Sequence, residues 1–216
     1  MKKNLIILVA VLLTSTFAFA QSGNMFVTGH LGFKTNSSST SAAGTTVDIP
    51  GGNSFDIMAE FHYKVTKNIA VGLGLDYERA SSFAGYTPQN AECYNTSSMF
   101  SIVPSVIYGI KITDNFKYIP RLYVSIGFGG LDQENTNADP IVTNTTDMTS
   151  FSIGIKPLSF EYGINKRLAI TMSFGDLYYG MDTETYTLGT VEVKDTYKGF
   201  NLNANYGASF GIRIYL

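Results

Sequence analysis

The chain contains one cysteine, no tryptophan, two histidines and few charged residues, which make up 15% of its 216 residues. A single cysteine, Cys93, allows no intramolecular disulfide. The charged fraction lies well below the roughly 25% of an average soluble domain, so part of the surface is expected to face a solvent other than water. Apart from residues 1–20, no apolar run approaches the ~18 residues that a transmembrane helix needs. A net charge of −2 gives no basic footprint for nucleic acid. Disulfide scaffolds, helical membrane proteins and nucleic-acid-binding domains are therefore disfavoured.

The N-terminus has the pattern of an export signal. Lys2 and Lys3 precede the apolar segment 5–13, and the small-x-small sequence Ala18-Phe19-Ala20 follows. A charged start, a short apolar region and small residues at the cleavage site are typical of a secretory signal peptide. We predict that residues 1–20 are removed and that residues 21–216 form one mature domain.

The mature chain alternates between apolar and polar residues, which is the period of a β-strand. One face carries apolar residues such as Ile57, Leu73 and Ile126, and the other carries polar or small residues such as Glu60 and Gly74. At Lys156-Pro157 the alternation slips by one residue, which predicts a bulge because proline cannot donate to a ladder. Eight such stretches span residues 25–33, 55–65, 69–77, 100–112, 116–128, 151–164, 168–174 and 200–216.

Two architectures explain this alternation. In a soluble sandwich or lipocalin-like barrel the apolar face points inward, whereas in a transmembrane barrel it faces lipid and the polar face lines the lumen. The strand length, two girdles of Phe and Tyr at the strand ends, and the connections between strands favour the transmembrane barrel. Short turns are expected at 66–68, 113–115 and 165–167, and long polar loops at 35–53, 80–97, 129–147 and 180–196.

The signal peptide, the eight alternating stretches and the closing sequence Phe210-Gly-Ile-Arg-Ile-Tyr-Leu216 together resemble the small outer-membrane β-barrels of the OmpA/OmpX type. The resemblance implies an all-β fold: an eight-stranded antiparallel up-and-down transmembrane β-barrel with short periplasmic turns and long extracellular loops. It also implies residence in the cell outer membrane, contact with lipid and lipopolysaccharide, and delivery by the barrel assembly machinery. The apolar side of the closing sequence is similar to the signal that this machinery recognises; its residues are Phe210, Ile212, Ile214 and Leu216.

Charged residues on the lumen face are nearly balanced in sign. An eight-stranded barrel has an interior just wide enough for side chains to fill, and buried charges are tolerated when they are paired. We therefore predict a lumen closed by a polar network. Its expected members are Glu60, His62, Asp76, Lys111, Lys117, Arg121, Lys156, Glu161 and Arg213.

No motif indicates chemistry. His30 and His62 both fall on the lumen face, and strand phasing brings His30 near Glu60, which a structural pair explains more simply than catalysis. Cys93 falls in an expected loop with no nearby histidine. The sequence has no phosphate-binding glycine loop and no metal-ligand spacing. We expect no catalytic residues, no cofactor and no metal.

The expected loops are acidic, with Asp132, Glu134, Glu184 and Glu192 among their residues, and basic residues gather near the short turns. Three functions remain open. The first is a non-enzymatic surface barrel that serves envelope integrity or adhesion through its acidic loops, with divalent cations bridging to lipopolysaccharide or an unidentified extracellular ligand. The second is a narrow channel, or a transporter for small or apolar solutes with lateral exit. The third is a lipid-modifying barrel enzyme. The sequence does not choose among them, because one small barrel shape hosts different functions.

Overall fold

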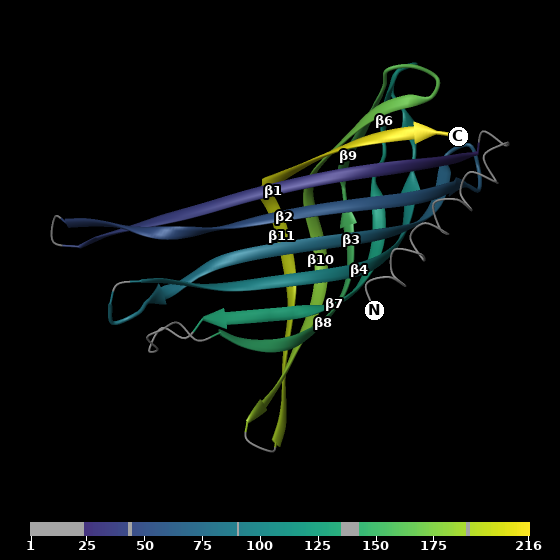
Figure 1. Cartoon of the computed structure of the whole chain (residues 1–216). Helices are drawn as coiled ribbons and strands as arrows, with labels where there is room; N and C mark the ends of the chain where they lie inside the picture. The colour runs from purple at the N-terminus through teal and green to yellow at the C-terminus, as the bar shows by residue number, and fades with distance from the viewer. Residues whose placement is uncertain (1–23, 43–44, 90, 135–142, 189–190) are drawn as a thin grey trace.

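The computed structural model describes residues 24–42, 45–89, 91–134, 143–188 and 191–216; the expected signal peptide lies outside them. The described residues are all-β, and none of them forms a helix that could cross a membrane. Neighbouring strands run antiparallel in one sheet (Figure 1). The strands are β1 (Met25–Ala42), β2 (Thr45–Lys64), β3 (Ile69–Tyr86), β4 (Glu92–Tyr108), β5 (Ile110–Lys111), β6 (Phe116–Tyr118), β7 (Arg121–Glu134), β8 (Thr143–Lys156), β9 (Leu158–Gly163), β10 (Leu168–Leu188) and β11 (Val191–Tyr215).

The sheet closes on itself because β11 pairs with both β10 and β1. Three of the strands are interrupted by a short break: β4 is continued by β5, β6 by β7, and β8 by β9. Counting each interrupted strand once, the ring has eight strands, which we call strand positions. These positions coincide with the eight stretches expected from the sequence, and the eight-stranded antiparallel barrel is confirmed. The expected bulge at Pro157 is present: the register changes between the pair Arg121–Lys156 and the pair Lys117–Glu161.

One irregularity was not expected. Phe174 pairs with Ala208 but Asp176 pairs with Asn203, so Gly175 alone lies opposite residues 204–207. Gly175 has a φ of 70°, a conformation that side chains other than glycine rarely adopt. The register between these two strands therefore shifts just beyond the expected stretch 168–174, while the alternation is kept: Phe174, Phe200, Leu202 and Phe210 are all exposed, as expected. Beyond Phe174 the strand phase of β10 reverses, which turns Asp176 and Tyr178 inward.

The two faces of the sheet show which solvent surrounds the barrel. The expected outward residues, such as Leu73 and Ile126, are exposed at 49% and 42%, while the polar Glu60 and Arg213 are 1% and 3% exposed. A soluble barrel would show the reverse. Closure also leaves no sheet edge unpaired within the ring, which is the condition for crossing a bilayer. The apolar exterior is thus the lipid-facing surface of a membrane barrel.

Three turns at one end of the barrel share a hydrogen-bonding pattern. In residues 65–68, 112–115 and 164–167 the second side chain, Thr66, Thr113 or Asn165, accepts a hydrogen bond from the backbone N–H three residues later, at 2.9–3.1 Å. These short side chains satisfy turn donors locally, as Asn and Thr do in Asx- and ST-turns. We call this end of the barrel the turn end and the opposite end the hairpin end.

At the hairpin end the polar segments expected as loops are largely strand. β1 and β2 stay paired as far as Ala42 and Thr45, and β10 and β11 as far as Leu188 and Val191. Threonine is well suited to strands, and antiparallel pairing continues wherever both strands extend. Pairing between β1 and β11, in contrast, covers only Phe26–Leu31 against Phe210–Tyr215. Beyond it the β1–β2 and β10–β11 hairpins point in different directions (Figure 1).

The lipid-facing phase predicts how an added charge behaves. Leu73 lies midway along the apolar stretch 69–77 of β3, so Leu73→Arg is expected to lower the free energy of unfolding by roughly 2–4 kcal/mol. Val65→Arg, in the turn at the edge of the apolar band, is the matched control and is expected to cost about 0–1 kcal/mol. Urea unfolding of barrels folded in phospholipid vesicles measures both. Equal costs at the two positions would contradict the assigned lipid face.

The orientation expected from the sequence places the hairpin end outside the cell. Cys93 is fully buried, so introduced cysteines report without native background. On intact cells a membrane-impermeant maleimide is expected to label Glu192→Cys, in the β10–β11 hairpin, and to leave Lys166→Cys, in a turn, unlabelled. Labelling of Lys166→Cys alone would reverse the orientation.

Candidate functional site: a sealed lumen beneath an acidic cup

The lumen near the turn end is filled by a cluster around Glu161. Lys117 donates to the Glu161 carboxylate at 2.7 Å, Tyr215 donates its hydroxyl at 2.7 Å, and Arg213 forms a buried ion pair with it. Arg213 also donates to the Thr28 hydroxyl at 3.0 Å. These residues come from four strand positions, so this turn-end cluster ties β1, β6, β9 and β11 together across the interior.

An aromatic layer lies next to this cluster. The Arg213 guanidinium lies 4.2 Å from the centroid of the Phe26 ring. The Phe26 ring also stacks on the His62 imidazole, with 4.8 Å between the ring centroids. His62 Nε2 is 3.2 Å from the Ser105 hydroxyl. Phe26 and His62 are 2% and 0% exposed, so both rings are shielded from water.

A central cluster follows around Glu60. Arg121 forms an ion pair with Glu60 at 2.6 Å, His30 Nε2 lies 3.2 Å from the other carboxylate oxygen, and the Ser105 hydroxyl is 3.5 Å away. The Arg121 guanidinium also contacts the Met58 sulfur at 3.8 Å. The contact between His30 and Glu60 is the one expected from strand phasing. The buried carboxylate has a full cation beside it, which is the condition for keeping an ion out of water.

Glycines on the inner face provide the space that these side chains need. Gly72 pairs with His62 on one side and Ser105 on the other, and a Cβ on Gly72 would lie 2.3 Å from the imidazole. The imidazole therefore lies across β3 and reaches Ser105 on β4. Gly74 likewise leaves space for the Glu60 side chain to cross β3, since a Cβ on Gly74 would lie 3.1 Å from that side chain. The inward glycines are thus explained by lumen crowding, as expected.

The grouping of Ser105, His62 and Glu60 superficially resembles a hydrolase triad. In a triad the carboxylate binds the histidine nitrogen that does not face the serine. Here Glu60 binds the serine, and His62 Nδ1 has no hydrogen-bond partner in the described part of the chain. All three side chains are at most 6% exposed, so no substrate reaches them. The arrangement is that of a packed interior.

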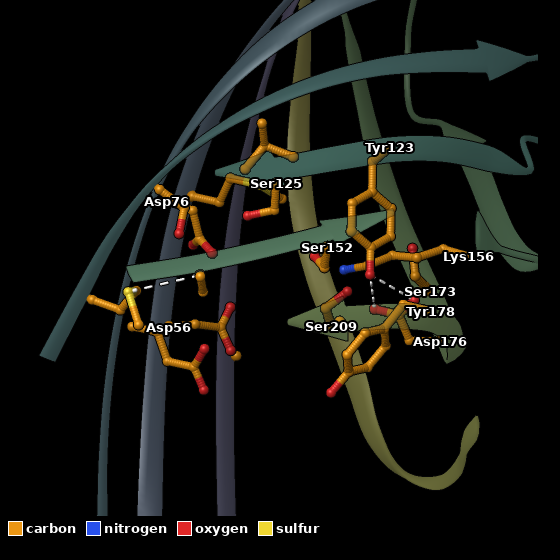
Figure 2. Close-up of a pocket in the computed structure, with 18 of the residues that line it drawn as sticks. Asp56, Asp76, Tyr123, Ser125, Ser152, Lys156, Ser173, Asp176, Tyr178 and Ser209 are labelled. Carbon is orange, nitrogen blue, oxygen red and sulfur yellow. Dashed lines mark hydrogen bonds between the residues drawn. The ribbon is translucent and has the colours of Figure 1, made fainter. Parts of the chain in front are cut away.

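Toward the hairpin end the lumen opens into a cavity of about 410 Å³. Asp56, Asp76 and Glu78 line it from β2 and β3, and Asp176 and Asp182 line it from β10. Tyr123 donates its hydroxyl to Asp176 at 2.9 Å (Figure 2). We call this cavity the acidic cup. Its other polar lining residues include Arg121, Lys156, Tyr178 and the serines Ser97, Ser101, Ser125, Ser150, Ser152, Ser173 and Ser209.

The structure distributes the predicted network over three places. Lys117, Glu161 and Arg213 lie in the turn-end cluster, Glu60, His62 and Arg121 lie at or beside the central cluster, and Asp76 and Lys156 line the cup.

The prediction for Lys111 is wrong. It lies beyond the end of the lumen, as the last residue of β5, where its side chain is 64% exposed and pairs with Asp114 at 2.6 Å. The hydrogen bond from the Lys111 ammonium lowers the pKa of the Asp114 carboxyl. Strand phase alone placed Lys111 correctly on the inner side, but the barrel wall has ended at this height.

Several interior residues were not singled out from the sequence. Asp56, Tyr123 and Tyr215 each lie two residues from an inward side chain on the same strand. The period of two therefore already identifies them as inward-facing. Asp176 and Tyr178 turn inward because of the break at Gly175, which periodicity alone does not reveal. Cys93, expected in a loop, lies on β4 and is buried beside the β3 register shift.

A closed antiparallel barrel with an apolar exterior and a polar, ion-paired interior defines the class of the protein: it is an integral outer-membrane β-barrel. With eight strand positions it has the architecture of the small OmpA/OmpX-type barrels. The terminal residues Phe210, Ile212 and Ile214 lie on the lipid face, which agrees with their expected place.

Comparison with known proteins gives similarity to solved structures only; no family model and no curated protein sequence matches the chain. Neisserial surface protein A is 15% identical, with 90% of this chain and 98% of that chain covered and a TM-score of 0.38. Ail, the attachment invasion locus protein of Yersinia pestis, in complex with the heparin analogue sucrose octasulfate, is 12% identical over 88% and 96%, with a TM-score of 0.38. The N-terminal β-barrel domain of Pseudomonas aeruginosa OprF is 16% identical over 88% and 96%, with a TM-score of 0.29.

The turn-end cluster predicts the effect of removing its carboxylate. Glu161→Ala leaves the Arg213 guanidinium buried without its partner, and we expect a loss of about 3–5 kcal/mol in the free energy of unfolding. Glu192→Ala is the matched control, because Glu192 pairs with Lys194 where both side chains are 62% exposed, and such pairs contribute about 0–1 kcal/mol. Urea unfolding in vesicles compares the two. Similar losses would show that the Glu161 pair contributes no more than a surface pair.

Proposed function

We propose that the protein is a non-enzymatic, non-conducting outer-membrane barrel that acts by binding at the cell surface through its hairpin end. The observation that carries the proposal is the sealed lumen. Two buried ion-pair clusters, centred on Glu60 and Glu161, lie one above the other with the Phe26–His62 stack between them. A solute entering the cup meets this filled interior, so binding at the outer end is supported over passage through the barrel.

The charge of the hairpin end supports a role in contact with the outer leaflet or an external partner. Acidic side chains there include Asp132 and Glu192, which are exposed, and Glu134 and Asp195, which are half-buried and accept hydrogen bonds from Tyr94 and Tyr186. Carboxylates at this height face the phosphate groups of lipopolysaccharide, and divalent cations bridge two such anions. The proposed partners are therefore lipopolysaccharide and an extracellular ligand, and the lipid-facing end of β11 is the proposed signal for the barrel assembly machinery.

The two other functions have less support. A channel needs a hydrated path, and the described lumen has none beside Glu60, Arg121 and His62, which are all at most 6% exposed. A lipid-modifying enzyme needs its catalytic residues at the outer rim near lipid. Both histidines lie instead within the sealed half, in contact with Glu60 and Ser105.

Conductance tests the sealed lumen. In planar bilayers the wild-type barrel is expected to show no steady open channel. Glu60→Ala removes the partner of Arg121 and is expected to produce measurable openings, because a lone buried guanidinium draws in water. Asp132→Asn, on an exposed hairpin position, is the control and should stay silent. Large, stable wild-type conductance would overturn the proposal and favour the channel.

A further inference from the structure

The acidic cup has two walls that face each other across the lumen, and only one of them carries basic residues beside its carboxylates (Figure 2). Asp56, Asp76 and Glu78 stand together on β2 and β3, where Asp56 pairs in register with Glu78 and Met58 pairs with Asp76. Lys156 on β8 and Arg121 on β7 line the other side. A cavity of about 410 Å³ is within the usual range of roughly 300–1,000 Å³ for a small-molecule site.

The acidic wall has unsatisfied capacity for a cation. Asp76 Oδ1 is shielded from solvent and has no hydrogen-bond partner in the described residues. Asp56 forms no ion pair with any described residue, and its carboxylate packs over Gly32, where a Cβ would lie 1.9 Å from it. Neighbouring like charges on one sheet destabilise each other, so a positively charged group placed between them would be stabilised.

The opposite wall has unsatisfied capacity for an anion. Arg121 is 6% exposed and its Nε has no partner among the described residues, although Glu60 holds the other side of its guanidinium. The Lys156 ammonium has no carboxylate within 4 Å in the described part of the chain. In Figure 2 it extends toward the cavity between Ser152 and Asp176. Asp176 is engaged by Tyr123, which leaves the ammonium available to an incoming carboxylate.

A metal ion does not fit this pattern. No group of three carboxylate, histidine or cysteine side chains among the described residues is arranged to hold one. The walls also present Tyr123, Tyr178 and the thioethers of Met58 and Met99, which suit the carbon chain of an organic ligand. Asp56 and Asp76, which form no ion pair with a described residue, outnumber Lys156, because Arg121 is already neutralised by Glu60. This favours a ligand with net positive charge.

We propose that the acidic cup binds a small basic zwitterion, namely a basic amino acid or the end of a short basic peptide. The ammonium or guanidinium groups of the ligand lie against Asp56 and Asp76, and its carboxylate lies against Lys156. This inference rests on the proposed function, because the cup takes ligands from the cell surface when the hairpin end faces outward and the lumen below is sealed.

Three probes of related shape test the assignment by calorimetry on the full barrel in nanodiscs: L-lysine, cadaverine, which lacks the carboxylate, and 6-aminohexanoate, which lacks the α-ammonium. L-Lysine is expected to bind tightest. Asp76→Asn is expected to weaken both lysine and cadaverine by about tenfold or more, since it removes a charge-assisted contact. Lys156→Met is expected to abolish the preference for lysine over cadaverine. Glu192→Gln, outside the cup, is the control and should bind as wild type does.

Each alternative result is informative. Equal or tighter binding of cadaverine by the wild type would overturn the role of Lys156, and tighter binding of calcium than of all three probes would overturn an organic ligand. Absence of binding by a wild-type barrel that is folded and silent in bilayers would overturn the cup assignment while leaving the sealed barrel intact. A conducting wild type would instead overturn the proposed function. A difference in mobility between unheated and heated samples in SDS gels confirms that each variant is folded.

Discussion

The ion pair between Glu60 and Arg121 is the interaction on which the interior depends. It joins β2 to β7 across the lumen, at a height where the enclosed space is only wide enough for side chains. Either charge alone would be stranded in a site from which water is excluded, and removing one partner of such a pair typically costs about 3–5 kcal/mol. The pair therefore both closes the lumen and fixes which strands face each other.

The surrounding residues follow from that constraint. A carboxylate as large as Glu60 crosses the lumen only if its neighbour on β3 has no side chain, and Gly74 occupies that position. Its remaining capacity is taken by His30 and Ser105. The turn-end cluster repeats the solution with Glu161, Arg213 and Tyr215. Two carboxylates, each surrounded by donors from different strands, act in place of the disulfides that a single cysteine cannot form.

The period of two in the sequence predicts most of the fold, because each side chain in a strand faces either lipid or the lumen, and these two environments differ sharply in polarity. It therefore predicted the eight strands, the lipid face and the slip at Pro157. It did not predict which carboxylate meets which base, since partners such as Glu60 and Arg121 lie three strand positions apart and their meeting depends on stagger. Lys111 shows the other limit: its phase is inward, but phase says nothing about where the wall ends.

The division of the lumen into a sealed half and an open half has its origin in two backbone features. Pairing between β1 and β11 stops at Leu31 and Phe210, and β10 breaks register at Gly175 close to the same height. Below this level eight paired strands hold the interior narrow enough for ion pairs to fill it. Above it the hairpins diverge, and the phase reversal turns Asp176 toward the cavity when continued alternation would have turned it to lipid. The acidic cup thus forms where the ring loses its pairing, directly above the central cluster, in which Glu60 and Arg121 already neutralise each other.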